Sequence, residues 1–154
     1  MNAMRSSVLP LAITMGDPGG IGPDVTLSAY SDRVERDLPP FYVLADPALL
    51  SARAERMGLK VKLGEATPET ALEIFPHALP VVPLPASVED RPGIADSANA
   101  EAVLASIRMA VADTLAGRAG ALVTNPINKK ALYDAGFHHP GHTEYLAHLC
   151  QLRL

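Results

Sequence analysis

Residues Ala119–Leu152 read AGALVTNPINKKALYDAGFHHPGHTEYLAHLCQL, and the organisation of the chain can be worked out from this stretch. Its first segment, Ala121–Thr124, is apolar on both faces, which predicts a strand inside a parallel sheet and not at a surface edge. Asn125 and Pro126 then predict a helix start, with asparagine as the N-cap and proline at the first helical position. Gly136 predicts the left-handed end of that helix.

A second helix in this stretch is predicted to begin near Thr143, after the turn at Pro140 and Gly141. Two helix N-termini therefore lie close in sequence to Lys129, His142 and Thr143. Because free backbone N–H groups and the helix dipole favour an anion at such a position, we expect a site for a small carboxylate or phosphate. The alternative is that Thr143 only caps its helix and that the lysines lie on a solvated face.

Composition describes a globular protein of one domain, with 154 residues, 48% hydrophobic and 19% charged. The net charge of −4 gives no electrostatic footprint for nucleic acid or an anionic membrane. No apolar run approaches the ~20 residues of a membrane-spanning helix, and Met1–Pro10 lacks the pattern of a signal peptide. Cys150 is alone, which suits a reducing compartment, and we expect it to pack beside Leu146 and Leu149. We therefore expect a cytoplasmic protein.

Strands and helices alternate along the sequence, which predicts an α/β fold with a parallel sheet covered on both faces. The predicted strands are Leu9–Met15, Phe41–Ala45, Val61–Leu63, Val81–Val82 and Ala121–Thr124. Four helical segments are predicted before Ala121. The first begins at Pro23, and the second runs from Pro47 to Met57 after the cap Asp46. A helical turn is expected over Glu69–Phe75 and a long helix over Ala98–Ala116.

The helix predicted over Ala98–Ala116 has the clearest periodicity. Its apolar stripe consists of Leu104, Ile107, Val111 and Leu115. Asp96 or Ser97 is expected to cap it, and Gly117 to end it.

The glycine-rich loop Gly16–Gly22 follows the first predicted strand. Its spacing does not match the G-x-G-x-x-G fingerprint, and no Lys-Ser or Lys-Thr follows to make a phosphate-binding P-loop. The glycines are explained either by a tight turn into the next helix or by a ligand at the carboxyl end of a parallel strand. Asp17 and Asp24 could form a carboxylate pair, although the helix dipole alone would account for Asp24.

The histidines near the C-terminal end do not match a zinc motif that we can justify. His138 and His139 are adjacent and should point apart. We expect His138, His139 and His148 to be surface residues.

Three segments in the same order resemble the family of 4-hydroxythreonine-4-phosphate dehydrogenase (PdxA) and its PdxA-like relatives. They are Ile13–Asp24 (ITMGDPGGIGPD), Thr124–Lys129 (TNPINK) and Gly141–Glu144 (GHTE). The resemblance runs from about Leu11 to Leu154 and corresponds to about the first half of a family member. It implies a parallel-sheet α/β/α domain similar to the isocitrate and isopropylmalate dehydrogenase fold. Residues 1–125 would form this first domain, and 126–154 would begin an incomplete second domain.

The resemblance also implies the reaction. It is an NAD- and divalent-metal-dependent oxidation, with decarboxylation, of 4-phosphohydroxy-L-threonine or a related phosphorylated hydroxy acid in pyridoxal 5'-phosphate synthesis. NADP is the alternative cofactor, and the metal could be zinc, magnesium or cobalt. The enzyme is expected to be a homodimer without nucleic-acid or membrane partners. The sequence Asn125–Asn128 favours the PdxA-like branch, which includes threonate and erythronate 4-phosphate dehydrogenases. A catalytically silent fragment that only binds an anion or dimerises is the rival hypothesis.

The resemblance assigns individual residues to parts of the site. His142 and Thr143 match the positions that contact substrate, and Lys129 matches a motif lysine with an electrostatic role. By likeness to the wider fold, the residues close to the cofactor are Gly19, Gly20 and Gly22. The family's metal is held by histidines further along the chain, so we assign no metal ligand and no catalytic residue here.

Overall fold

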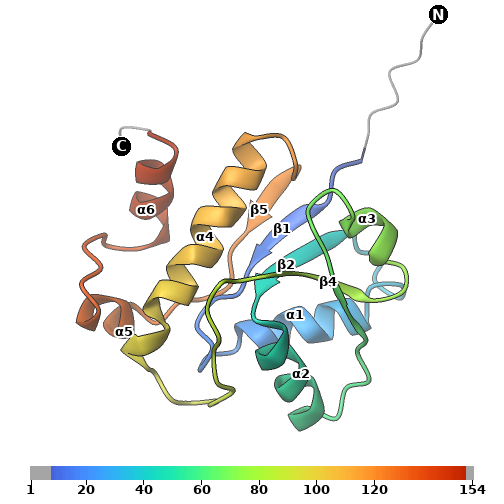
Figure 1. The fold of residues 1–154 in the computed structure, drawn as a ribbon, viewed down its shortest axis with the longest axis horizontal. Helices are drawn as coiled ribbons and strands as arrows, with labels where there is room; N and C mark the ends of the chain where they lie inside the picture. Colours follow the sequence, from blue (N-terminus) through green and yellow to red (C-terminus); the bar gives the residue numbers. More distant parts are fainter. Residues whose placement is uncertain (1–7, 152–154) are drawn as a thin grey trace, which may run out of the picture.

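Five parallel strands form one sheet, with the order β3-β4-β2-β1-β5, in the computed structural model of this protein (Figure 1). The structure describes residues 8–151. The strands are β1 (Leu11–Thr14), β2 (Phe41–Ala45), β3 (Leu63–Glu65), β4 (Leu79–Pro83) and β5 (Ala121–Val123). The helices are α1 (Gly22–Ser31), α2 (Pro47–Arg56), α3 (Ala71–Ile74), the 3-10 helix η1 (Ser97–Asn99), α4 (Ala100–Leu115), α5 (Lys129–Asp134) and α6 (His142–Leu149). The predicted α/β class is therefore confirmed.

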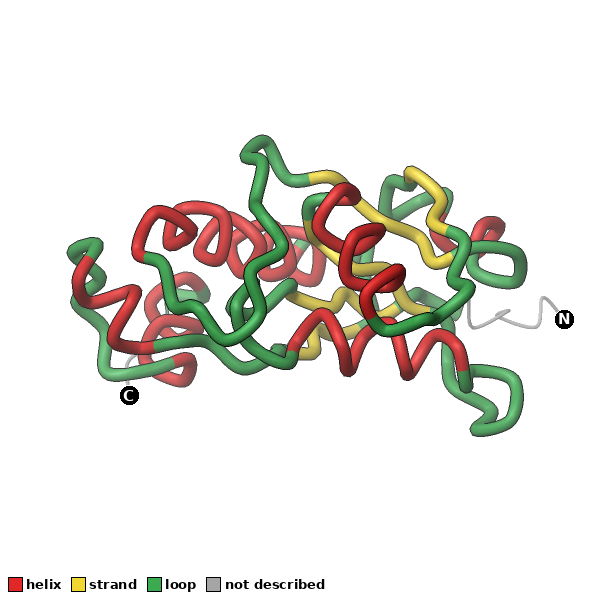
Figure 2. Tube along the Cα trace, turned by 90° about the horizontal axis from the view of Figure 1, so that it is seen from below, coloured by secondary structure: helices red, strands yellow, loops and turns green. Residues whose placement is uncertain are grey.

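The central strand β2 is buried along its whole length and shows how the layers are built. Adjacent side chains of a strand point to opposite faces. Phe41 meets the ring of Tyr30 in α1 edge-on, with centroids 6.3 Å apart. The hydroxyl of Tyr42 donates to Asp113 of α4 at 2.7 Å. Helices α1 and α4 therefore cover opposite faces of the sheet, and Figure 2 shows helices on both sides of the strands.

Helix α4 lies across β1, β2 and β5 with a buried face that differs in part from the predicted stripe. Ile107 and Val111 are buried as predicted, but Leu115 is 67% exposed. The buried Ser106 links the helix to the sheet, because its hydroxyl accepts from the Met15 N–H, just past β1, at 2.9 Å and donates to the Leu44 carbonyl of β2 at 2.7 Å. The predicted stripe therefore fails at Leu115, the last residue of α4.

The predicted starts and stops of several helices are confirmed. Asp46 caps α2, and Asp96 accepts from the Ala98 N–H at 2.9 Å to cap η1, which leads into α4. Gly117 and Gly136 have φ angles of +73° and +92°, the left-handed conformation expected just past a helix end.

The prediction of an internal strand at Ala121–Thr124 is wrong. Strand β5 pairs only with β1 and forms the edge of the described sheet. Both Ala121 and Val123 are exposed, the latter by 45%. An apolar run reports the character of the two faces of a strand but not its place in the strand order.

The prediction of a helix start at Asn125 and Pro126 is also wrong. Helix α5 begins at Lys129, and its N-cap is Asn128, whose side chain accepts from the Ala131 N–H at 3.0 Å. The cap-plus-proline pattern failed because the Asn125 side chain is engaged by β1 and α1 and is not free to cap a helix.

Helix α6 begins at His142, one residue before the predicted start, with Gly141 at its N-cap. No side chain of the described residues caps it, so the part of the alternative in which Thr143 is a cap is not supported. The other part is confirmed, because Lys129 and Lys130 are both exposed. Cys150 packs against the core together with Leu146 and Leu149, as expected.

Three further sequence predictions concern a short strand, membrane-spanning helices and the N-terminal residues. The strand expected at Val61–Leu63 is displaced to Leu63–Glu65. No helix within residues 8–151 is long and apolar enough to cross a membrane. The interpretation of Met1–Pro10 rests mostly on residues outside the described range.

Candidate functional site

The strand order changes direction at β1. The chain passes from β1 to β2 on one side of β1, and it later reaches β5 on the other side. The loops after β1 and β5 therefore separate at this point of the sheet. In open parallel sheets, ligands bind in the crevice at the carboxyl ends of the strands where such a switch occurs.

Asn125 ties the two loops of the switch point together. Its side-chain amide donates to the Thr14 carbonyl and to the Thr26 hydroxyl, both at 2.8 Å. Its backbone N–H donates to the Thr14 hydroxyl at 3.0 Å. The Pro126 carbonyl accepts from the Asp17 N–H at 2.8 Å. These bonds fix the loop after β5 against the loop after β1.

The glycines of the loop after β1 are required by close packing. A Cβ added at Gly16, whose φ is +75°, would lie 2.7 Å from both the Asn125 Cβ and the Pro126 carbonyl oxygen. A Cβ at Gly19 would lie 2.1 Å from the Ile94 carbonyl oxygen, and one at Gly22 would lie 2.7 Å from that of Met15. Packing therefore explains Gly19 and Gly22 without a ligand. The cofactor proximity assigned to Gly19, Gly20 and Gly22 stays a prediction.

Asp17 and Asp24 face different partners. Asp17 is buried and accepts from the Gly19 N–H at 3.3 Å. Burial raises its pKa, and the Gly19 hydrogen bond and the charge of Arg53 oppose that rise. Asp24 forms an ion pair with Arg53. The helix dipole is therefore not the main partner of Asp24 as the sequence suggested.

The start of α6 gathers the residues expected to bind an anion. A Cβ built on Gly141 would lie 3.6 Å from both the Lys129 Nζ and the Glu144 Oε2. The Nε2 atom of His142 is buried and has no hydrogen-bond partner among the described residues. Burial and then the positive charge of Lys129 lower the pKa of His142. Thr143 is exposed in the first turn of α6. The structure thus brings Lys129 and His142 together.

The glycine loop and the start of α5 meet at a small cavity. The cavity has a volume of about 10 Å³, and among its lining residues are Asp17, Asp96, Asn128 and Leu132. This space suffices for about one water molecule. Lys129 follows Asn128 directly, so the two predicted binding regions approach each other across this cavity.

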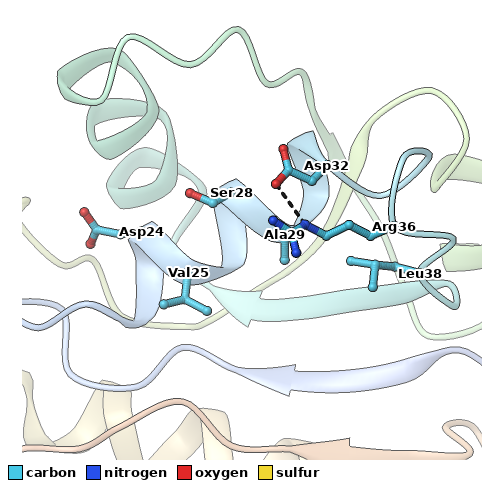
Figure 3. Close-up of a pocket in the computed structure, with 7 residues that line it drawn as sticks. All are labelled: Asp24, Val25, Ser28, Ala29, Asp32, Arg36 and Leu38. Atoms are coloured by element: carbon cyan, nitrogen blue, oxygen red, sulfur yellow. Dashed lines mark hydrogen bonds and ion pairs between the residues drawn. The ribbon is translucent and has the colours of Figure 1, made fainter.

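A larger groove runs along the outer flank of α1. Its volume is about 440 Å³, and Figure 3 shows Val25 and Leu38 beside it, with the Asp32–Arg36 ion pair at one end. None of the residues predicted to bind substrate or cofactor lines this groove. Its size therefore does not identify the ligand site.

Sequence reasoning missed Arg53. Arg53 is 1% exposed, and its side chain reaches from α2 to the glycine loop. The available signal was its position. Leu49, Leu50 and Ala54 are the other buried residues of α2 outside its ends, so Arg53 lies on the apolar stripe of an amphipathic helix. A charged residue on such a stripe needs buried partners.

His139 and His148 belong to an aromatic cluster with Phe137 and Tyr145. His139 is half-buried, with its ring centroid 5.1 Å from that of Tyr145 and 4.9 Å from that of His148. His138 and His148 are exposed as predicted, but His139 is only partly at the surface. Within residues 8–151, no group of three or more His, Cys, Asp or Glu side chains could hold a metal ion.

Known proteins resemble this chain over nearly its whole length. The family model described as "Pyridoxal phosphate biosynthetic protein PdxA" matches residues 37–153. A 4-hydroxythreonine-4-phosphate dehydrogenase of Methylorubrum extorquens is 53% identical over 95% of the chain, which covers 42% of that protein. The enzyme of the same name from Bradyrhizobium diazoefficiens is 49% identical over 91% of the chain, which covers 43% of it. The chain thus spans less than half the length of these relatives.

Solved structures agree with the sequence relatives. A crystal structure of a 4-hydroxythreonine-4-phosphate dehydrogenase from Burkholderia phymatum has a TM-score of 0.83 and 26% identity, covering 97% of this chain and 46% of that one. The corresponding enzyme from Klebsiella pneumoniae gives a TM-score of 0.77 and 30% identity, covering 93% of this chain and 45% of that one. The predicted resemblance, limited to the first part of the family's length, is confirmed. This chain belongs to the PdxA family.

Proposed function

We propose that this chain supplies the substrate-anion site of a dehydrogenase that oxidises a phosphorylated hydroxy acid, with 4-phosphohydroxy-L-threonine as the first candidate substrate. The proposal rests on the start of α6, where the buried Nε2 of His142 lacks a partner in the described part of the chain and Lys129 lies beside Gly141. Buried polar atoms are normally hydrogen-bonded, so an unpartnered one marks a place where a ligand can complete the arrangement.

Each residue has a distinct part in binding the anion. Lys129 supplies a positive charge, and the exposed Thr143 supplies a hydroxyl donor beside the free N–H groups of the first turn of α6. His142 offers a ring nitrogen whose protonation is disfavoured until a negative group arrives. A phosphate or carboxylate has the charge and the acceptors that this set requires.

A nicotinamide cofactor, NAD with NADP as the alternative, is proposed at the switch point, near Gly19, Gly20 and Gly22. The position fits, because α1 begins here without a side-chain cap and the Asp24 carboxylate is paired with Arg53. When bound, the nicotinamide accepts the hydride that leaves the substrate alcohol. The chain's own contribution is a loop held in one conformation by close packing.

A divalent metal does not fit the described residues, which offer no suitable ligand set. We therefore derive no step through a metal here. In the complete enzyme we propose that zinc, magnesium or cobalt is held by residues outside this chain. We also propose that 126–154 begins a second domain, and that the enzyme is a cytoplasmic homodimer.

Two alternatives accompany this proposal. The sequence Asn125–Asn128 favours a PdxA-like enzyme acting on threonate or erythronate 4-phosphate. The other is a catalytically silent fragment that only binds an anion or dimerises, which the turnover measurement below separates from the active enzyme.

The experiment separates binding from turnover. We expect the purified chain to bind 4-phosphohydroxy-L-threonine, measured by calorimetry, and His142→Ala to weaken that binding at least tenfold. His138→Ala, which alters an exposed histidine outside the site, is the matched control. Equal affinity of wild type and His142→Ala for this phosphoester would contradict the proposed anion site. NADH formation by the chain with any of the three metals would exclude the silent fragment.

A further inference from the structure

Within residues 8–151, Arg53 is the only buried arginine or lysine, and it lies at the centre of a hydrogen-bond network around the glycine loop. One terminal nitrogen donates to the Pro18 carbonyl at 2.7 Å, and the other donates to the Gly20 carbonyl at 3.1 Å. The latter also pairs with the Asp24 carboxylate, while Nε donates to Asp90 at 2.7 Å. A single side chain thus holds two loop carbonyls and two carboxylates.

The network reaches the loop from a second direction. The Gly93 N–H donates to the Gly19 carbonyl at 2.7 Å, so three consecutive carbonyls of the loop, at residues 18, 19 and 20, accept hydrogen bonds. The stretch carrying Gly93 is itself anchored through Asp90, which also accepts from Arg56 at 2.9 Å. Burial pushes the pKa of Asp90 upward, but the bonds from Arg56 and Arg53 outweigh burial and hold it below its ordinary value.

Only arginine can make this set of contacts. Its planar guanidinium presents donors in several fixed directions, whereas a lysine at the same place offers one compact ammonium group. Lysine would keep the positive charge near Asp24 and Asp90. It would leave loop carbonyls without donors, and buried carbonyls without donors destabilise the conformation that buries them.

We propose that Arg53 is a positioning residue for the switch-point site, acting through the glycine loop. By holding the carbonyls of Pro18 and Gly20 inward and neutralising Asp24, it fixes the loop surface offered to a ligand and removes a negative charge from the start of α1. The effect on cofactor binding rests on the proposed function. The effect on the loop itself does not.

The test compares Arg53→Lys with Arg56→Lys. Both variants keep the charge, both residues lie on α2, and both contact Asp90, but Arg56 makes no bond to the glycine loop. Hydrogen exchange of the Gly20 and Gly93 amides reports the loop, and exchange of the Val43 amide in β2 reports the whole fold. NADH fluorescence titration reports cofactor binding.

In Arg53→Lys we expect the Gly20 and Gly93 amides to exchange at least tenfold faster, with Val43 unchanged, and NADH affinity to fall at least tenfold. Arg56→Lys should leave all three readouts within twofold of wild type. Unchanged loop exchange in Arg53→Lys overturns the proposal, as does an equal acceleration at Val43, which marks a purely structural role.

Two further outcomes are covered by the design. If wild type binds no NADH, the proposed cofactor site fails, while loop exchange still decides the positioning role of Arg53. If Arg53→Lys does not fold, Asp24→Asn takes its place, because it removes one partner of Arg53 at a partly exposed position. About threefold faster exchange at Gly20 then supports the proposal, and no change overturns it.

Discussion

The glycine loop after β1 leads into helix α1, and the first turn of α6 begins another helix, but the two segments use their polar groups in opposite ways. In the loop, the carbonyls of residues 18, 19 and 20 all accept hydrogen bonds. At the start of α6, the buried His142 Nε2 has no hydrogen-bond partner within residues 8–151, and burial followed by the charge of Lys129 disfavours protonation of the ring. The three loop carbonyls thus have partners within the described residues, whereas the His142 ring nitrogen does not.

This difference distinguishes a loop that maintains its own conformation from a segment that we propose binds an anion. Fully bonded buried polar groups hold one conformation, because breaking any bond leaves a group unsatisfied. A site with unmet hydrogen-bonding capacity contributes little to stability and gains when a ligand binds. Substitutions in the loop should therefore lower stability, and substitutions at α6 should mainly alter binding and protonation.

The largest effect is expected from Arg53→Met. Removing the guanidinium leaves Asp90, whose side chain is 4% exposed, and two loop carbonyls without their donor. Removing one partner of a buried ion pair costs about 3–5 kcal/mol, and urea unfolding should show a loss of that order. Arg36→Met, which breaks an exposed i,i+4 pair, should lose less than about 0.5 kcal/mol. Equal losses in the two variants would contradict the scaffold role.

Two glycines with positive φ give the next test. Gly16→Ala combines the strain of a left-handed alanine with contacts of 2.7 Å to Asn125 and Pro126, whereas the same change at Gly136 meets open space. We expect the free energy of unfolding to fall by about 2–4 kcal/mol at Gly16, where strain and overpacking combine, and by about 1 kcal/mol at Gly136, where strain acts alone. Chemical denaturation of both variants measures the difference. Similar losses would mean that the loop can relax and is not tightly packed.

The fold could be predicted from local signals that act within one element. The whole of β2, the caps Asp46 and Asp96, and the stops at Gly117 and Gly136 were all readable, because each depends on neighbouring residues. The edge position of β5 was not readable, since strand order depends on contacts between distant segments. Asn125 failed for a similar reason: its local pattern favours a cap, but bonds to Thr14 and Thr26 determine its conformation.

The site was predictable only where a motif carried it. Lys129, His142 and Thr143 follow from the resemblance, and the structure places Lys129 beside the start of α6. Arg53 carries no motif, and its partners Pro18, Gly20 and Asp90 are separated from it by more than thirty positions along the chain. A single sequence does not show which distant carbonyls a buried arginine will meet.

Asn125 and His142 provide a direct comparison of the two regions, with a smaller expected effect. Asn125→Ala leaves buried acceptors at Thr14 and Thr26 without their donor, which should cost about 1–3 kcal/mol. His142→Ala removes an atom that has no partner, so unfolding stability should change by less than about 1 kcal/mol while phosphoester binding is lost. Thermal and urea unfolding of both variants measure these two changes in stability. A larger stability loss at His142 would indicate a structural role for its ring.

The smallest effect concerns the protonation of His142, followed by NMR titration of its ring protons. Burial and the charge of Lys129 lower its pKa, so Lys129→Met should raise the pKa, and bound phosphate should raise it further. The lowered pKa makes the stability of the fold depend on pH. Because the folded pKa lies below the unfolded value of about 6.5, the unfolded chain binds more protons between the two values. Stability from this residue is therefore complete above about pH 6.5 and is lost as the pH falls toward the folded pKa. Lys129→Met should reduce that loss, and Lys130→Met, which alters an exposed lysine paired with Asp134, should not. If Lys129→Met left the His142 titration unchanged, the lysine would be too far from the ring to share an anion with it.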